Sequence, residues 1–500
     1  MKPTIKPITI LLLVFFLYAC SEKPKEKTEE NIQLFDEKYR PQYHFSPPQQ
    51  WMNDPNGMVY LDGEYHLFYQ HYPDSNVWGP MHWGHAVSKD MLNWEHLPIA
   101  LYPDSLGYIF SGSAVIDHGK TSGLGKDGND PMVAIFTYHQ NQKGQTQGIA
   151  FSNDKGRSWT KYNGNPVLKS PGIPDFRDPK VSWYEQTNGE GKWIMTLAVK
   201  DKISFYSSPN LIDWKHESDF NPDWAAYGGV WECPDLFPLT TPDGNEKWVL
   251  LVSINPGGPN GGSATQYFIG QFDGQTFTAE GSDVKWIDYG ADNYAGVTWS
   301  NIPQEDGRRL FLGWMSNWQY ANVVPTQVWR SAMTIPRELQ LVKDNSGNIL
   351  LSSTPVKEIQ NLVESTNVVE GASFTLDHNL FQLDLGKTPE QPGSVILSND
   401  LGESITLQIS NDAITFDRSN AGHTDFQDEF GNIHHAPMKN IKVENISIFS
   451  DRSSLEFFFN DGEMVMTEII FPTAPLLKVE LKGFKGENKV HYFKSIWNNQ

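Results

Sequence analysis

The sequence predicts an all-β protein, in which a five-bladed β-propeller is followed by a C-terminal β-sandwich. Three observations support this prediction. Apolar residues at helical spacing are nearly absent between residues 45 and 340, one strand-like run recurs five times in that region, and alternating strands fill the chain from about residue 368. Short apolar or alternating runs bounded by Gly, Pro, Asn or Asp indicate strands.

The N-terminal segment indicates export. Two lysines precede an apolar run, Ile8 to Leu17, which is too short to span a bilayer. We therefore predict a signal peptide over residues 1–19. The ending LYAC resembles a bacterial lipobox, which predicts an exported lipoprotein with Cys20 lipidated and held at a membrane, in the periplasm or at the cell surface; a plain signal peptide is the alternative. Residues 20–38 are charged and poor in apolar side chains, as in a flexible tether.

Composition excludes several classes of function. A net charge of −21 makes the chain a poor candidate for binding nucleic acid. Only two cysteines are present, so with Cys20 acylated Cys233 has no disulfide partner. The sequence holds no Walker loop, dinucleotide fingerprint or zinc-binding spacing, and we expect no cofactor and no metal. The 17 tryptophans fit either sugar recognition or an aromatic-rich β core.

The repeat defines the propeller. Its five copies are EYHLFYQ from residue 64, MVAIFTY from 132, KWIMTLA from 192, KWVLLVS from 247 and RLFLGWM from 309. A long β repeat of this kind is typical of a propeller, with one four-stranded blade per copy. We place the propeller at residues 39–354.

A polar tip precedes each copy and leads into a strand. The first tip, WMNDPNG, predicts a tight turn, with Asp54 on a rigid corner formed by Pro55 and Gly57. The first strand of each propeller blade lines the central channel, so equivalent positions in five blades converge. We expect five tip residues to meet at one end of that channel: Asp54, Ser111, Asp178, Glu232 and Asp292.

Carboxylates gathered in this way repel one another, which raises some of their pKa values and costs stability, so a functional site explains them better than packing does. Two carboxylates in unlike surroundings suit glycoside hydrolysis. Glu232, in a semi-apolar tip, suits the acid that must stay protonated, whereas Asp54 could stay ionised as the nucleophile. Arg177 would fix Asp178 by its charge; an ordinary surface ion pair is the alternative.

Five blocks carry a family resemblance. WMNDPNG, FSGS, FRDP, WECPD and DYGADNYA together resemble the signature blocks of glycoside hydrolase family 32, the invertase, inulinase and levanase group. The resemblance implies a propeller with a C-terminal sandwich, and a retaining hydrolase that cuts β-fructofuranosidic bonds. It implies Asp54 as the nucleophile, Glu232 as the general acid/base and Asp178 as the transition-state stabiliser. Around the terminal fructose it also places Asn53, Gln70, Trp78, Phe110, Ser111 and Arg177.

Two further residues are expected to bind substrate. Asp292 belongs to the fifth tip, and Trp314 opens a segment, GWMSNWQYANVVPTQVWRSAMTIPREL, that resembles that of fructan-degrading members and secreted invertases. Core packing competes with sugar contact as the role of Trp318 and Trp329. A retaining mechanism also requires that the carboxyl groups of the nucleophile and the acid lie about 5–5.5 Å apart.

The C-terminal part completes the predicted organisation. Residues 355–367 are predicted as a short helical linker, and residues 368–500 as two packed antiparallel sheets. A packing role against the propeller is favoured over a carbohydrate-binding module.

Several alternatives stay open at this point. The predicted substrates are sucrose and a fructan, which is either levan or inulin. A fructosyltransferase would use the same site, a non-catalytic fructan-binding propeller would not need three acids, and an arabinose-cleaving propeller would invert the anomeric configuration. Linkage preference, β-2,1 or β-2,6, and exo or endo action are not predicted.

Overall fold

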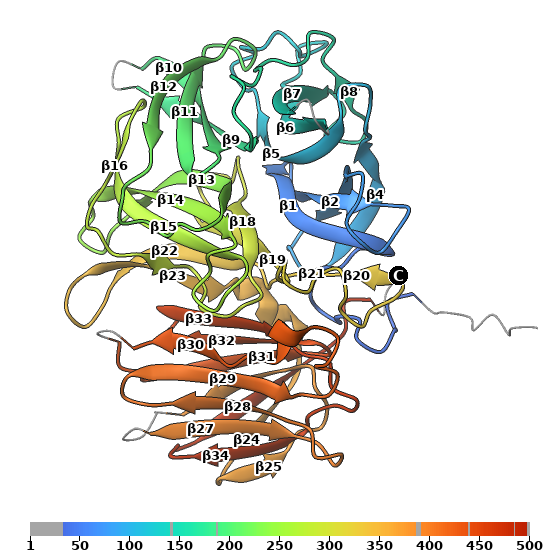
Figure 1. Ribbon diagram of the computed structural model, residues 1–500, viewed down its shortest axis with the longest axis vertical. Coiled ribbons are helices and arrows are strands. Elements are labelled where there is room, and N and C mark those ends of the chain that lie inside the picture. Colours follow the sequence, from blue (N-terminus) through green and yellow to red (C-terminus); the bar gives the residue numbers. More distant parts are fainter. Residues whose placement is uncertain are drawn as a thin grey trace, which may run out of the picture.

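The computed structural model describes residues 34–140, 144–186, 189–386, 392–438, 441–484 and 486–497. Its strands form a five-bladed propeller in contact with a two-sheet sandwich (Figure 1), which confirms the predicted fold class. The predicted signal peptide, Cys20 and the tether as far as residue 33 lie outside the described residues. Within the described ranges no helix is long and apolar enough to cross a membrane.

Each blade is an antiparallel sheet whose main strands follow one another along the chain. The blades are β1 (Gln50–Leu61), β2 (Glu64–Tyr72), β3 (His82–Ser88) and β4 (Trp94–Leu101); β5 (Tyr108–Ile116), β6 (Met132–Gln140), β7 (Gly144–Ser152) and β8 (Thr160–Lys161); β9 (Phe176–Glu185), β10 (Gly191–Val199), β11 (Lys202–Ser208) and β12 (Lys215–Phe220); β13 (Val230–Thr240), β14 (Glu246–Asn255), β15 (Ala264–Phe272), β16 (Phe277–Ala279) and β17 (Lys285–Trp286); and β18 (Tyr294–Thr298), β19 (Arg309–Met315), β21 (Ala332–Met333), β22 (Arg337–Lys343) and β23 (Ile349–Pro355).

The innermost strands β1, β5, β9, β13 and β18 contact one another in order, and β18 returns to β1, so the ring is closed. β20 (Trp329–Arg330) strengthens the closure by pairing parallel to β1. Apolar clusters fill the space between neighbouring blades, as where Phe68 and Trp83 meet Phe136. Most of the large aromatic content serves these cores, since the largest fully buried side chains include Trp51, Trp83, Trp231, Trp299 and Trp314.

The stretch WMNDPNG is not the predicted turn. It lies within β1, whose register against β2 shifts twice between Met52 and Val59. Pro55 is tolerated because β1 is the innermost strand and Pro55 needs no ladder bond on the channel side. Gly57 takes a φ of +52°, and a Cβ there would lie 2.6 Å from the ring of Phe68. The turn-forming residues therefore make β-bulges inside a strand.

The same irregularity recurs at one level of the channel in all five inner strands. In the other four strands the register shifts between residues 109 and 112, 177 and 180, 232 and 235, and 294 and 297. A bulge adds a residue to one strand and re-aims its side chains. Each blade can therefore point a polar side chain into the channel without losing the rest of its ladder.

The sandwich consists of two six-stranded sheets. One holds, in order, β24 (Val363–Val369), β35 (Asn488–Phe493), β26 (Phe381–Leu385), β31 (Ile446–Asp451), β32 (Ser454–Phe459) and β33 (Met464–Ile469); the other holds β25 (Ser373–Thr375), β34 (Lys478–Lys482), β27 (Gly393–Ser398), β28 (Ser404–Ile409), β29 (Ala413–Asn420) and β30 (His434–Pro437).

The chain boundaries differ from the prediction in two places. The linker contains the 3₁₀ helix η1 (Lys357–Leu362), but its last residues already belong to β24, which pairs with β35. β24 is an exposed edge strand, so it lacks the alternation that marks a buried face. Residues 34–38, predicted as the end of the tether, pack against the sandwich, where Phe35 stacks on Trp497 with ring centroids 4.1 Å apart. A second 3₁₀ helix, η2 (Asp428–Gly431), follows β29.

The propeller and the sandwich share a buried ionic interface. Residues 288–292 run along β33, where the Asp292 N–H donates to the Thr467 carbonyl at 3.0 Å. Arg337 of the propeller, fully buried, donates to Asp288 at 3.0 Å and to Glu456 of the sandwich at 2.5 Å. Unpaired buried charges are costly, so these contacts hold the two domains in one arrangement.

His44 adds a titratable group to this interface. Its ring nitrogens contact Asp451 at 2.8 Å and Glu456 at 2.9 Å, and the ring is buried. Burial alone would lower the pKa of His44, but the two carboxylates outweigh it and raise the pKa to about 9. The imidazolium therefore stabilises the folded chain fully below pH 6.5, where the unfolded chain holds the proton too.

We expect the stability contributed by His44 to decline between pH 6.5 and 9, by on the order of 3 kcal/mol, because the unfolded chain loses its proton first. Thermal unfolding of wild type and His44→Asn across this range tests it. The Tm of the wild type should fall more steeply than that of the variant, and parallel profiles would contradict the pairing.

Candidate active site

A cavity of about 310 Å³ opens at the end of the channel where the inner strands carry their bulges. The first residues of β1, β5, β9 and β13 line it, so it draws on four blades, and β18 of the fifth blade supplies Tyr294 beside it. Asp54, Asp178 and Glu232 all face this cavity. Sequence positions far apart in the chain therefore meet in one site.

Asp54 is held by neighbouring donors. The Ser111 hydroxyl donates to Asp54 Oδ2 at 2.6 Å, Asn53 Nδ2 donates to Oδ1 at 2.9 Å, and the Cys233 thiol lies 3.4 Å from Oδ2. Asn53 is itself fixed by the Trp51 indole N–H, at 2.7 Å. This carboxylate has a defined orientation from three strands, β1, β5 and β13.

Arg177 joins the other two acids. It donates to Glu232 Oε1 through Nη2 at 2.8 Å and through Nε at 3.2 Å, and its Nε lies 3.9 Å from Asp178. The Tyr294 hydroxyl donates to the other oxygen of Glu232. Asp178 Oδ2 accepts the backbone N–H of Cys233 at 3.0 Å. Arg177 therefore lies inside the cavity and not at the surface, but its hydrogen bonds go to Glu232 and Asp175, and the predicted partner Asp178 lies farther away.

The electrostatics of the site favour a retained proton. Burial raises the pKa of Asp54, with a further rise from the charge of Glu232, against the lowering effect of the Ser111 hydrogen bond. Burial also raises the pKa of Asp178, to about 7, although the charge of Arg177 opposes the shift. One guanidinium, that of Arg177, shares the cavity with four carboxylates, those of Asp54, Asp175, Asp178 and Glu232, so at neutral pH this cluster can hold a proton and deliver it.

Nine of the predicted site residues line the cavity: Asn53, Asp54, Gln70, Trp78, Phe110, Ser111, Arg177, Asp178 and Glu232. Trp78 lies at the rim, 41% exposed, whereas Gln70 is buried and donates to the Ile109 carbonyl at 3.0 Å. The cavity also includes His139, Gln145, Asp175, Asn255 and Trp318, which the sequence analysis did not assign to the site. All five lie on the second or third strands of their blades or in loops, outside the five blocks.

Asp292 does not join the other tips. It is buried and accepts hydrogen bonds from the Tyr320 hydroxyl at 2.6 Å and from Arg418 of the sandwich at 2.7 Å. The expectation of a substrate contact is wrong because β18 begins two residues later, with Tyr294, and that residue occupies the fifth position at the channel. Asp292 instead fixes the domain interface.

Trp314 does not line the cavity either, although it was predicted to bind substrate. It is fully buried and lies behind Trp318, with ring centroids 4.9 Å apart. Trp318 lines the cavity, and its ring stacks on Trp51 at 5.8 Å. The ring of this segment that lines the cavity is therefore four residues later than predicted. Trp329 is buried under the Arg40 guanidinium, as core packing requires.

Comparison with known proteins gives two matching family models. The model of the glycosyl hydrolases family 32 N-terminal domain matches residues 44–354, and that of the glycosyl hydrolases family 32 C-terminal domain matches residues 352–498. Within the described residues, no group of three His, Cys, Asp or Glu side chains is arranged to hold a metal ion.

Individual proteins are similar over most of the chain. A levanase of Bacillus subtilis (strain 168) is 49% identical over 492 residues, covering 93% of this chain and 72% of that protein. An extracellular exo-inulinase of Aspergillus awamori is 35% identical over 558 residues and covers all of both chains. The crystal structure of exo-inulinase from Aspergillus awamori has a TM-score of 0.84 at 35% identity, covering 93% and 100% of the two chains. A β-fructofuranosidase from Schwanniomyces occidentalis, complexed with fructosyl-erythritol, has a TM-score of 0.83 at 29% identity, covering 93% and 99%.

A substitution at Asp292 tests whether this residue holds the domain interface or binds substrate. We expect Asp292→Asn to lower the free energy of unfolding by about 3 kcal/mol, because Arg418 loses its shortest carboxylate contact, while KM stays unchanged. Trp318→Ala is the matched comparison and should raise KM with little loss of stability. Chemical denaturation and steady-state kinetics measure both. If Asp292→Asn raised KM and left stability unchanged, Asp292 would be a substrate-binding residue and not an interface residue.

Proposed function

This chain belongs to glycoside hydrolase family 32, and from that premise we propose that it is a retaining β-fructofuranosidase that releases fructose from fructans and from sucrose. The meeting of Asp54, Asp178 and Glu232 in one cavity of about 310 Å³ carries the proposal. The similar proteins support it, since they are named levanase and exo-inulinase and cover most of this chain. The proposed substrates are sucrose and a fructan, which is either inulin or levan.

In the first step Asp54 attacks the anomeric carbon of the fructosyl unit and the bond to the leaving oxygen breaks. Ser111 and Asn53 stabilise the ionised carboxylate and aim it, each by one hydrogen bond. Glu232, the most exposed of the three acids at 19% for its side chain, gives its proton to the leaving oxygen. The product of this step is a fructosyl group esterified to Asp54.

In the second step water replaces the leaving group. Glu232, now ionised, takes a proton from the water, which attacks the same carbon and releases fructose from Asp54. Arg177 and the Tyr294 hydroxyl hold Glu232 in place, one at each oxygen, while it changes protonation state. Two displacements at one carbon give net retention of configuration.

Asp178 suits the third role, contact with the fructosyl hydroxyls. With its pKa raised to about 7, it can accept or donate a hydrogen bond at neutral pH. Contacts that strengthen as positive charge develops on the sugar lower the barrier more than they tighten substrate binding. Trp78, Phe110 and Trp318 complete the wall with rings suited to apolar faces of sugars.

We expect Glu232→Gln to lower kcat/KM by about 10²–10⁴-fold, because the variant lacks the general acid. Asp54→Asn should release no measurable fructose, because it lacks the nucleophile. Glu246→Gln, an exposed site in β14, is the matched control and should behave as wild type.

Products identify the reaction. Incubation with sucrose, inulin and levan should yield fructose alone if the enzyme acts at chain ends, a ladder if it cuts within chains, and longer oligosaccharides if it transfers fructose. Fructose formed initially with inverted configuration would contradict the retaining assignment. Normal turnover by folded Glu232→Gln would reject its role.

We also propose that residues 1–19 direct export and that a lipid on Cys20 holds the enzyme at a membrane. The apolar run and the LYAC sequence support this proposal. Cys20→Ser should move the enzyme from the membrane fraction to the soluble fraction. Equal distribution of both proteins would count against lipidation.

A further inference from the structure

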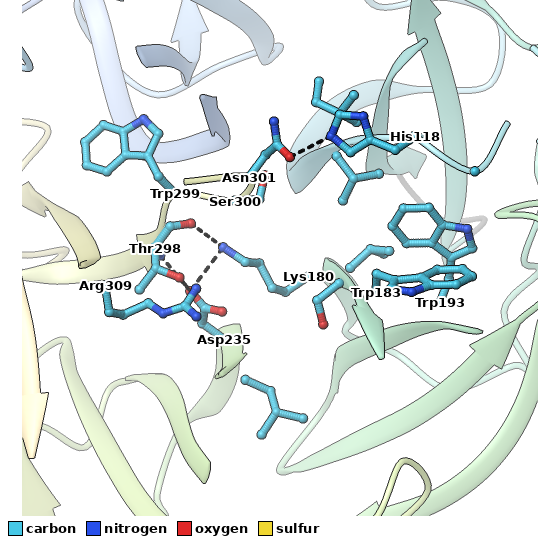
Figure 2. Close-up of a pocket in the computed structure, with 16 residues that line it drawn as sticks. His118, Lys180, Trp183, Trp193, Asp235, Thr298, Trp299, Ser300, Asn301 and Arg309 are labelled. Carbon is cyan, nitrogen blue, oxygen red and sulfur yellow. Dashed lines mark hydrogen bonds and ion pairs between the residues drawn. The ribbon is translucent and has the colours of Figure 1, made fainter. Parts of the chain in front are cut away.

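A second cavity, of about 350 Å³, occupies the other end of the propeller channel (Figure 2). The inner strands that begin at the acids end here. On β9 Asp178 is followed by Lys180 and Trp183, and on β13 Glu232 is followed by Asp235, all of which line their respective cavities. The residues of this second cavity have no part in the two-step reaction.

One side of the cavity holds unpaired polar atoms. Asp235 is 1% exposed, and its Oδ2 accepts from the Thr298 N–H at 2.6 Å and lies 3.1 Å from Lys180 Nζ. Asp235 Oδ1, however, has no hydrogen-bond partner among the described residues, and neither does the buried Nε of Arg309. Figure 2 shows the Arg309 guanidinium beside Asp235. A buried acceptor and a buried donor without partners each cost about 1–3 kcal/mol.

The opposite side is a rigid aromatic wall. Figure 2 places Trp183 and Trp193 across the cavity from Thr298 and Arg309. Trp183 is 44% exposed and packs edge to face on Trp193, with ring centroids 5.0 Å apart. The Trp193 indole N–H donates to the Thr121 hydroxyl at 2.8 Å, which fixes the pair. A Cβ at residue 191 would lie 2.1 Å from the Trp183 ring, so Gly191 gives that ring its place.

We propose that this cavity is a second carbohydrate-binding site, which takes a neutral sugar ring. A hydroxyl group both donates and accepts, so the hydroxyls of a sugar ring suit a side of the cavity that carries a carboxylate, Asp235, and two cations, Lys180 and Arg309. Lys180 and Arg309 outnumber Asp235 in the lining, so an anion is the rival ligand, and inorganic phosphate is the probe for it. The apolar face of the ring would cover Trp183, as aromatic side chains allow.

The identity of the sugar rests on the proposed function, because fructose is the product and fructosyl units form the polymer. Two sources share this chemistry: free fructose released by the enzyme, and a fructosyl unit of a bound chain. In the second case the site would hold the polymer on the face opposite the acids, and would raise affinity without changing the chemistry.

The test uses Glu232→Gln protein, which keeps substrates intact, labelled with 5-fluorotryptophan. The fluorine resonance that disappears in an added Trp183→Phe change is assigned to Trp183. Titration with fructose should shift this resonance if free sugar binds. In gels that contain levan or inulin, Trp183→Ala should weaken retardation by about three- to tenfold if the polymer binds, the range expected for one aromatic contact. Trp183→Phe should weaken retardation less than Trp183→Ala does. Tyr102→Ala, which removes another exposed ring, should not change retardation.

A response of Trp183 to fructose alone supports a site for released sugar, and a response in the gels supports a site for the polymer. In the wild-type background Trp183→Ala should leave kcat/KM on sucrose unchanged. The proposal is overturned if neither sugar nor polymer affects Trp183, or if inorganic phosphate shifts its resonance and sugars do not. Failure of the proposed function would appear separately, as absence of fructose release by the wild type, because the titration with free sugar requires no turnover.

Discussion

Three carboxylates, two buried and one partly exposed, must lie together at one end of the channel, and much of the surrounding structure compensates for their charge. Isolated buried carboxylates are costly, so each acid has its own donors. Asp54 has the Ser111 hydroxyl, Asp178 has the Cys233 N–H, and Glu232 has Arg177 and Tyr294. The compensation is incomplete, because the pKa values of Asp54 and Asp178 stay raised. At Asp54 the hydrogen bonds from Ser111 and Asn53 oppose the rise in pKa, which favours the ionised carboxylate that the attack requires.

The propeller makes this gathering possible through its five inner strands. Each strand carries a bulge at the same level, which turns side chains into the channel while the rest of the strand keeps its ladder. Beyond the bulges the same strands continue to the second cavity, so one ring of strands builds both ends. The buried ionic interface with the sandwich then fixes the fifth blade, through Asp288, Asp292 and Arg418.

The architecture and the three catalytic acids could be predicted from the sequence. The repeat indicates the blades, and equivalent positions in a ring of blades must converge. The sequence was insufficient where a shift of two to four residues decides which side chain faces the channel. Asp292 and Tyr294 differ by two positions, and Trp314 and Trp318 by four, and periodicity does not separate them. WMNDPNG was predicted as a turn because bulges and turns use the same residues, Pro and Gly. Neighbours from other strands, such as His139, carried no signal in the five blocks.

The central claim is that Asp54 is the nucleophile that carries the fructosyl group. Rapid acid quenching of the enzyme during turnover of sucrose, followed by peptic digestion and mass spectrometry, tests it most directly. We predict that the peptide containing Asp54 gains the mass of one fructosyl residue and loses it as substrate is exhausted. A quenched enzyme with no adduct on that peptide, or with the adduct on the peptide containing Asp178, would contradict the account.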